Sequence, residues 1–116
     1  MKITLTVAYV GFGGNIGNGE YFFCYDNDVI FVTDKDTSLE FVLSEATTSD
    51  FSMKTLLSTD STDQITKITR SSDNRSYNLT HRNTKSQMTL TTILVEDKKR
   101  GKLISCDPQI LNVPTN

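Results

Sequence analysis

The sequence predicts an all-β protein. Thr, Val and Ile together make up 32 of the 116 residues, whereas Ala occurs only twice and Trp is absent. Side chains that branch at Cβ lose rotamer freedom in a helix but pack well on a pleated sheet. Apolar residues recur with a period of two, and turn-forming residues recur at close to the spacing typical of sandwiches and barrels. We therefore expect an antiparallel β-sandwich of about eight to ten short strands, immunoglobulin-like in the broad sense, as a single domain over residues 1–116.

The first strands follow from alternation and from local turn chemistry. Residues 2–10 alternate apolar and polar side chains, as expected of a strand with one buried face. Residues 20–25 and 28–33 are aromatic and β-branched, and Asp26-Asn27 between them indicates a tight turn. Residues 38–45 alternate again.

Clusters of Ser, Asp, Asn and Gly separate the later segments, so each segment is expected to be a short strand. These strands are predicted at residues 51–58, 64–70, 76–81, 87–96 and 102–106, with 109–113 as an optional last strand. The alternation in turn predicts which side chains face the core. The predicted core comprises Ile3, Leu5, Val7, Phe22, Ile30, Val32, Leu39, Phe41, Leu43, Met53, Leu57, Leu90, Leu94 and Ile104.

Five glycines fall within the nine residues Gly11–Gly19, directly after the first expected strand. A dinucleotide-binding G-x-G-x-x-G loop opens a helix, but here Ile16 occupies the place of the third glycine and a strand follows. We expect instead a long flexible hairpin loop or a wide bulge, in which glycine supplies positive φ angles and which a two-residue turn could replace. The candidate contact residues for a partner are Phe12, Gly13, Gly14 and Ile16.

An acidic segment partly matches a calcium-binding loop. Asp34, Asp36, Glu40 and Glu45 fall at positions 1, 3, 7 and 12 of the EF-hand pattern. Leu39 stands at position 6, where the pattern requires glycine, and the surrounding residues alternate as a strand rather than forming helices. An acidic turn that leads into a strand explains the same residues, and whether this turn binds a cation stays open.

The sequence shows no catalytic or metal-binding constellation. His81 is the only histidine, and a zinc or copper site needs several ligands at useful spacing. We expect His81 to be a polar residue at the end of a strand, and we expect no catalytic residue, no metal and no cofactor. Cys24 and Cys106 are expected to be buried and reduced, with a disulfide between them as the alternative.

The chain carries no apolar run of the length of a signal peptide core or a membrane span. The expected location is therefore the cytoplasm, without a membrane partner.

Charge is distributed unevenly along the chain. Residues 1–63 hold three Lys or Arg against ten Asp or Glu, whereas residues 64–116 hold nine against four. Solvated turns explain this difference, and complementary surfaces that favour a homo-oligomer are the alternative. The basic run at residues 98–102 lacks the interleaved aromatic side chains of a nucleic-acid site, so it is expected to be a solvated turn that discourages edge pairing, and no nucleic-acid partner is expected.

The end of the chain, from Lys102 to Pro114, places an Asp107-Pro108 pair six residues before a second proline. This pattern resembles the small bacterial DP-EP family and, more distantly, the inclusion-body proteins of the AidA/PixA type, which also close with an Asp-Pro strand. The resemblance implies a β-sandwich and a bacterial source, and it implies no catalytic residue. Independently of it, Pro108 lacks an N–H, so a strand must break or start there.

Two classes of function fit these observations. The first is a non-enzymatic module that binds a protein or a saccharide, or that assembles with copies of itself. The second is a small-ligand carrier or an enzyme whose site gathers scattered carboxylates and hydroxyls. The glycine-rich segment and the lack of a catalytic motif favour the first class.

Overall fold

A computed structural model describes residues 1–27, 29–60, 62–112 and 114, without the side chains of residues 87, 88, 109, 111 and 112. Ten strands and no helix form over this part of the chain. The strands are β1 (Lys2–Tyr9), β2 (Tyr21–Tyr25), β3 (Val29–Val32), β4 (Thr37–Leu43), β5 (Phe51–Ser58), β6 (Ile65–Arg70), β7 (Ser76–His81), β8 (Gln87–Asp97), β9 (Lys102–Cys106) and β10 (Gln109–Asn112). All ten predicted segments are thus strands, although the predicted ends at Asp28 and Val113 lie outside the described residues.

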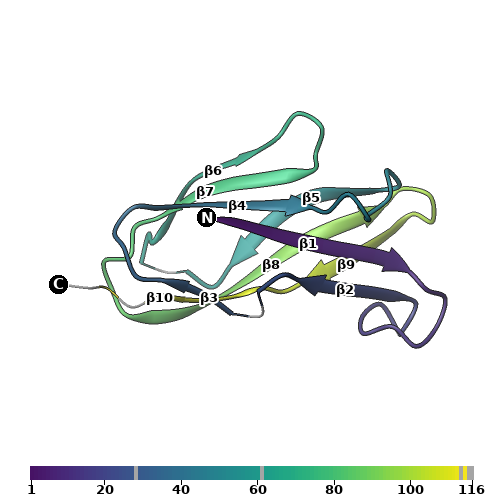
Figure 1. The fold of residues 1–116 in the computed structure, drawn as a ribbon, viewed down its shortest axis with the longest axis horizontal. Helices are drawn as coiled ribbons and strands as arrows, with labels where there is room; N and C mark the ends of the chain where they lie inside the picture. The colour runs from purple at the N-terminus through teal and green to yellow at the C-terminus, as the bar shows by residue number, and fades with distance from the viewer. Residues whose placement is uncertain (28, 61, 113, 115–116) are drawn as a thin grey trace.

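The strands form two sheets that pack as a sandwich (Figure 1). The first sheet has the order β2-β1-β4-β7-β6, and the second has the order β3-β10-β8-β5 with β9 also paired to β8. Most pairs are antiparallel, but β1 runs parallel to β4 and β3 runs parallel to β10. The expectation of a purely antiparallel sandwich is therefore wrong at these two pairs.

The longest strand, β8, organises the second sheet. Its first part pairs with β10 and its last part with β9, so β9 and β10 lie one after the other along the same edge. Asp107 and Pro108 separate these two strands, as expected from the missing N–H of proline. The Thr92 hydroxyl donates a hydrogen bond of 2.7 Å to the Asp107 carboxylate at this break.

The predicted core is largely confirmed, and its buried members form one apolar cluster between the sheets. The confirmed residues are Ile3, Leu5, Val7, Ile30, Val32, Leu39, Phe41, Leu43, Met53 and Ile104. Phe22, Leu57 and Leu90 are instead exposed, and Leu94 is half-buried.

These four errors have a local cause in each strand. In β5 the register shifts between Met53 and Thr55, so Leu56 points inward after the irregularity and Leu57 points outward. In β2 and β8 apolar side chains occupy both alternating sets, so the pattern does not reveal which set is inside. Tyr21 rather than Phe22 is buried in β2. In β8 the buried set comprises Thr89, Thr91, Ile93, Val95 and Asp97.

Arg75, in the turn between β6 and β7 of the first sheet, binds the β4–β5 connection and the start of β5 in the second sheet. Its guanidinium donates to the carbonyl oxygens of Ser44 and Thr47 at 3.0 and 2.8 Å. It also donates to those of Thr48 and Phe51 at 3.1 and 3.3 Å. Four carbonyl groups thereby gain a charged donor, which is a strong form of hydrogen bond.

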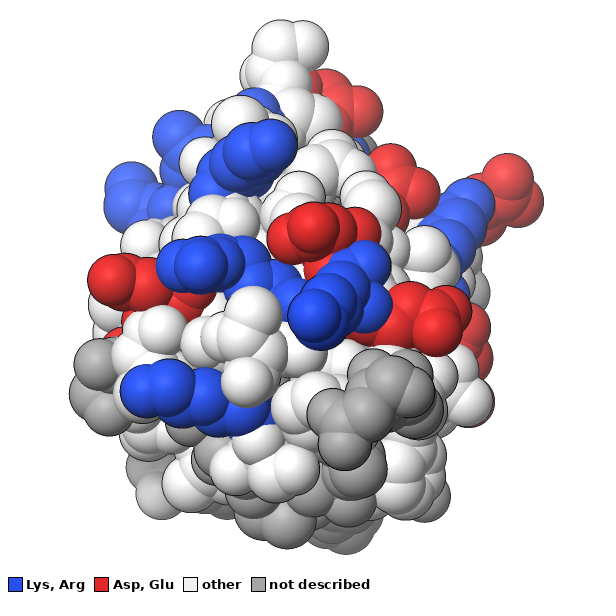
Figure 2. All heavy atoms as spheres, turned by 90° about the vertical axis from the view of Figure 1, so that its left-hand side faces the viewer, with Lys and Arg blue, Asp and Glu red and all other residues white. Residues whose placement is uncertain are grey.

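The uneven charge of the sequence does not produce a face of one sign at the end of the sandwich seen in Figure 2, where basic and acidic side chains alternate. The fold brings the acidic first half and the basic second half together here. The Asp36 amide, for example, donates to the Arg82 carbonyl at 3.2 Å.

Phe41 tests the packing of the core most directly, because its side chain is fully buried between the sheets. Truncation in Phe41→Ala is expected to lower the free energy of unfolding by about 3–5 kcal/mol through lost burial and a residual cavity. Urea denaturation of both proteins measures this change. A loss below about 1 kcal/mol, close to the roughly 0.5 kcal/mol range of surface substitutions, would show that Phe41 does not lie in the core.

Candidate functional site

The glycine-rich segment lies at one end of the sandwich, where it connects β1 to β2 (Figure 1, right). It folds back on the start of β2, because Ile16 and Tyr21 exchange two backbone hydrogen bonds of 3.2 Å. The Gly14 amide closes the segment internally by donating to the Gly19 carbonyl at 2.8 Å. Positive φ angles at Gly11, Gly13, Gly17 and Gly19 confirm the expected use of glycine.

Asn15 covers the outer edge of β2. Its side-chain amide donates to the Phe23 carbonyl at 2.8 Å, and its side-chain oxygen accepts from the Phe23 amide at 2.9 Å. One side chain thus replaces the neighbouring strand that β2 lacks on this side, which protects the edge from pairing with another chain.

Two glycines are required for close packing against Tyr21. A Cβ atom at Gly14 would lie 1.9 Å from the Tyr21 carbonyl oxygen, and one at Gly17 would lie 2.9 Å from the Tyr21 ring. Together with the hydrogen bonds, this packing shows that the segment makes specific contacts with β2, and its replacement by a two-residue turn stays a prediction. Such a replacement would remove the Ile16–Tyr21 pairing, and the Phe23 backbone would lose its two hydrogen bonds to the Asn15 side chain.

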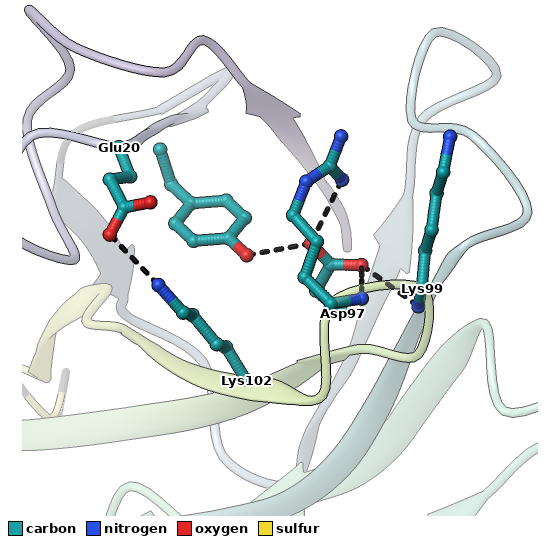
Figure 3. Close-up of polar contacts among 6 residues, drawn as sticks. Glu20, Asp97, Lys99 and Lys102 are labelled. Carbon is teal, nitrogen blue, oxygen red and sulfur yellow. Dashed lines mark hydrogen bonds and ion pairs between the residues drawn. The ribbon is translucent and has the colours of Figure 1, made fainter.

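Tyr21 in turn is anchored on a buried carboxylate. Its hydroxyl donates to Asp97 Oδ2 at 2.6 Å, and Arg100 Nη1 donates to the same oxygen at 3.1 Å. The backbone amides of Lys99 and Arg100 donate to Asp97 Oδ1 at 3.1 and 3.2 Å. Figure 3 shows the Lys99 amide bonded to Asp97 while its side chain points away. The carboxylate therefore binds β2 of one sheet and closes the β8–β9 turn of the other.

The hydrogen bonds determine the protonation states of Asp97 and Tyr21. Burial alone raises the pKa of Asp97, but the donors Tyr21 and Arg100 outweigh it and hold the pKa below its usual range. Burial and the hydrogen bond to Asp97 raise the pKa of Tyr21 to about 12. At neutral pH the group is thus an ionised carboxylate that accepts from a neutral phenol.

Charged side chains complete this end of the molecule. The Arg100 guanidinium lies 3.5 Å from the centre of the Tyr9 ring, in the geometry of a cation–π contact. Lys102 Nζ bonds Glu20 Oε1 at 2.8 Å across the junction of β9 and β2 (Figure 3). Two residues of the basic run that was expected to be a solvated turn therefore make specific contacts, whereas Lys98 and Lys99 are exposed.

The predicted contact residues lie in different environments at this end. Phe12 is 87% exposed, the highest exposure of any large apolar side chain in the described ranges. Gly13 is exposed as well, but Gly14 is half-buried and Ile16 packs against the core. A hollow of about 200 Å³ lies nearby, between the end of β1, the β4–β5 connection and Arg100.

The acidic turn does not assemble the calcium ligands of the EF-hand pattern. Asp34 and Glu45 lie beyond opposite ends of β4, which spans seven residues, or about 23 Å. The Asp34 carbonyl accepts from the Thr37 hydroxyl at 2.8 Å, as in an ordinary turn. Over the ranges that the structure describes, no three His, Cys, Asp or Glu side chains are grouped as metal ligands.

His81 ends β7 as expected, and its side chain is fully buried. Its Nδ1 accepts from the Asn83 amide at 3.1 Å, and its Nε2 is buried without a hydrogen-bond partner. Desolvation lowers the pKa of His81, and Asp60 offsets this only in part. The imidazole is therefore neutral at neutral pH, with the proton on Nε2.

The two thiols are not bonded to each other. Cys106 is buried as expected, and burial raises its pKa to about 12. Cys24 is exposed on the outer face of the first sheet, so the expectation that both thiols are buried is wrong.

Tyr21, Asp97, Arg100 and Tyr9 were not predicted as a group. The sequence did contain a signal for Asp97, because this residue directly precedes the turn at residues 98–101. An aspartate at that place commonly accepts hydrogen bonds from the backbone amides of the turn. Its contact with Tyr21 joins residues 76 positions apart and leaves no local pattern.

Comparison with known protein families and with characterised proteins finds no match to this chain. In the described part of the structure, no helix has the length and apolar composition needed to cross a membrane.

Gly14 and Gly13 form a matched pair for testing the packed loop. Gly14→Ala is expected to lower the free energy of unfolding by at least about 3 kcal/mol, because the new methyl group meets the Tyr21 backbone. Gly13→Ala meets no atom within 4 Å and is expected to cost only about 1–2 kcal/mol through its positive φ. Urea denaturation compares the two. Equal losses would show that the segment is not packed against Tyr21.

Proposed function

We propose that this protein is a non-enzymatic binding module that uses the glycine-rich end of its sandwich to contact a partner protein. The observation that carries the proposal is the Phe12 side chain, which is 87% exposed on a segment whose backbone is hydrogen-bonded on both sides. An exposed aromatic ring costs free energy in water, and a backbone that is already ordered loses less entropy on binding.

The surroundings of Phe12 support this role. Val10 and Tyr9, two and three positions before Phe12, are 44% and 40% exposed, so apolar surface continues along the chain from the loop to the end of β1. Lys98 and Lys99 add exposed charges on the neighbouring β8–β9 turn. An apolar centre with a polar rim is typical of protein–protein interfaces.

The carboxylate at this end is better suited to support than to chemistry. Asp97 is fully buried and accepts from four donors, so its oxygens face protein groups rather than a substrate. We therefore assign Asp97 and Tyr21 the role of holding the contact loop. The proposal includes a sandwich that is immunoglobulin-like in the broad sense, because such sandwiches present binding loops at their ends.

Photo-crosslinking tests the proposal. A benzophenone side chain placed at position 12 is expected to give a discrete cross-linked product in an extract of the source cells, and mass spectrometry identifies the partner. The same group at position 22, an exposed aromatic position on the outer face of the first sheet, is the matched control and is expected to give no such product.

Binding of the purified partner then gives the magnitude. Phe12→Ser is expected to weaken the affinity by about 30-fold to 1,000-fold, the range of a hot-spot side chain, without changing the unfolding free energy. Phe22→Ser is expected to leave the affinity unchanged. Equal affinities for wild type and Phe12→Ser would refute the proposal.

A further inference from the structure

The central strand β8 carries its side chains in an unusual arrangement. Its inward set includes Thr89, Thr91 and Asp97, each at most 1% exposed. Its outward set includes Leu90, which is 51% exposed, and Leu94, which is half-buried. Ile93 and Val95 are also inward and fully buried, so apolar side chains occupy both faces of β8, whereas a strand with only one buried face normally carries polar side chains outward.

These leucines belong to a continuous outward group that we call the leucine patch, comprising Leu57, Leu90, Leu94 and Leu103. Leu57 on β5 lies opposite Thr92, which stands between Leu90 and Leu94 on β8. Leu103 on β9 lies opposite Glu96 and is therefore a diagonal neighbour of Leu94. The patch crosses three strands of the second sheet.

The outer face of the first sheet is different. Its central strands carry Thr4, Thr6, Glu40 and Asn78 outward, opposite the buried set of each strand. Hydroxyl, amide and carboxylate groups suit a face in water. The centre of this face is therefore polar, and its exposed aromatic ring, Phe22, lies on the edge strand β2, whereas the second sheet carries exposed leucines on its central strand β8.

A shallow hollow of about 510 Å³ opens on the second sheet, where β9 and β10 separate. Leu57, Leu90 and Pro108 provide its apolar lining, and Asp107 provides its charge. The hollow makes the surface at the leucine patch concave, so apolar side chains of another molecule can fit into it.

We propose that the leucine patch is the interface of a homodimer, in which the same face of a second copy packs against it. This surface is distinct from the loop that carries Phe12, so the inference goes beyond the function proposed above. A second copy fits because it brings an equally apolar face, as an isologous contact requires.

The size of the face agrees with a weak but specific dimer. The strand β8 has 11 residues, so the face it forms with β5 and the β9–β10 edge measures about 36 by 14 Å, or about 500 Å². Two copies that pack over this whole face bury about 1,000 Å² together, which is at the lower limit for a specific interface. The core of each sandwich is complete without this contact, so the monomer is expected to be folded.

Charges at the rim of the patch are compatible with self-pairing. Lys54 is exposed on β5, Glu96 is half-exposed on β8, and Asp107 is exposed at the end of β9. A two-fold axis can bring Lys54 of one copy to a carboxylate of the other. Each copy therefore presents both positive and negative side chains to its partner.

Sedimentation equilibrium over a wide range of protein concentration tests the inference. The wild-type chain is expected to shift from its monomer mass of 13.0 kDa toward twice that mass as concentration rises. In the double variant Leu57→Thr/Leu90→Thr the dimer dissociation constant is expected to rise by at least about 100-fold, because each apolar contact is lost twice. Threonine suits an exposed strand position, so folding is expected to be retained.

Two controls assign the surface. Phe22→Thr removes an exposed aromatic ring from the outer face of the first sheet, and Phe12→Ser removes the one on the contact loop. Both are expected to dimerise like wild type. If the double variant does not melt cooperatively, Leu103→Lys at the end of the patch replaces it, with the same expected weakening.

A wild-type chain that stays monomeric at every concentration would overturn the inference. Dimerisation that is unchanged in the patch variants would also overturn it, and loss of the dimer in Phe12→Ser alone would place self-association on the loop instead.

Discussion

The hydrogen bond from the Tyr21 hydroxyl to the Asp97 carboxylate is the contact on which the other features of this protein depend. It spans 2.6 Å between β2 of the first sheet and the end of β8 in the second. The same carboxylate closes the β8–β9 turn and holds Arg100, which stacks on Tyr9. Tyr21 is also the surface against which Gly14 and Gly17 pack. A buried carboxylate is costly unless its oxygens are fully bonded, and here four donors meet that requirement.

This contact favours the observed inward face of β8, together with Ile93 and Val95, which are fully buried on the same face. Because side chains alternate along a strand, placing Asp97 inward sends Thr89 and Thr91 inward with it and sends Leu90 and Leu94 outward. A slip of one residue would bury the leucines but would expel the carboxylate and break the turn. The apolar outer face of the second sheet is thus a consequence of the polar contact at the end of the sandwich, and a second copy of the chain is a natural cover for it.

Local pattern was sufficient to predict the strands but not their faces. All ten strands follow from alternation and turn residues, because both signals are contained within a few neighbouring positions. The inward face of β8 could not be predicted, since both of its alternating sets contain apolar residues and the deciding partner, Tyr21, lies 76 positions away. Likewise, the irregularity after Met53 reverses the rest of β5 without any sequence signal. For the candidate site, the cluster of glycines in the sequence pointed to the segment that carries Phe12. The need for glycine at position 14 could not be predicted, because it depends on a carbonyl that only the folded chain brings near.

A double-mutant cycle between Tyr21→Phe and Asp97→Asn tests the central contact most directly. Unfolding in urea at neutral pH is expected to give a coupling energy of about 1.5–3 kcal/mol, the range of a hydrogen bond to a charged group. The pKa of Asp97 is lowered in the folded protein, so the stabilisation is present above the ordinary carboxyl pKa and is lost as pH falls through the lowered value. The coupling should therefore shrink in acid. A coupling near zero at neutral pH, or one that does not change in acid, would show that the two sheets are not held together by this bond.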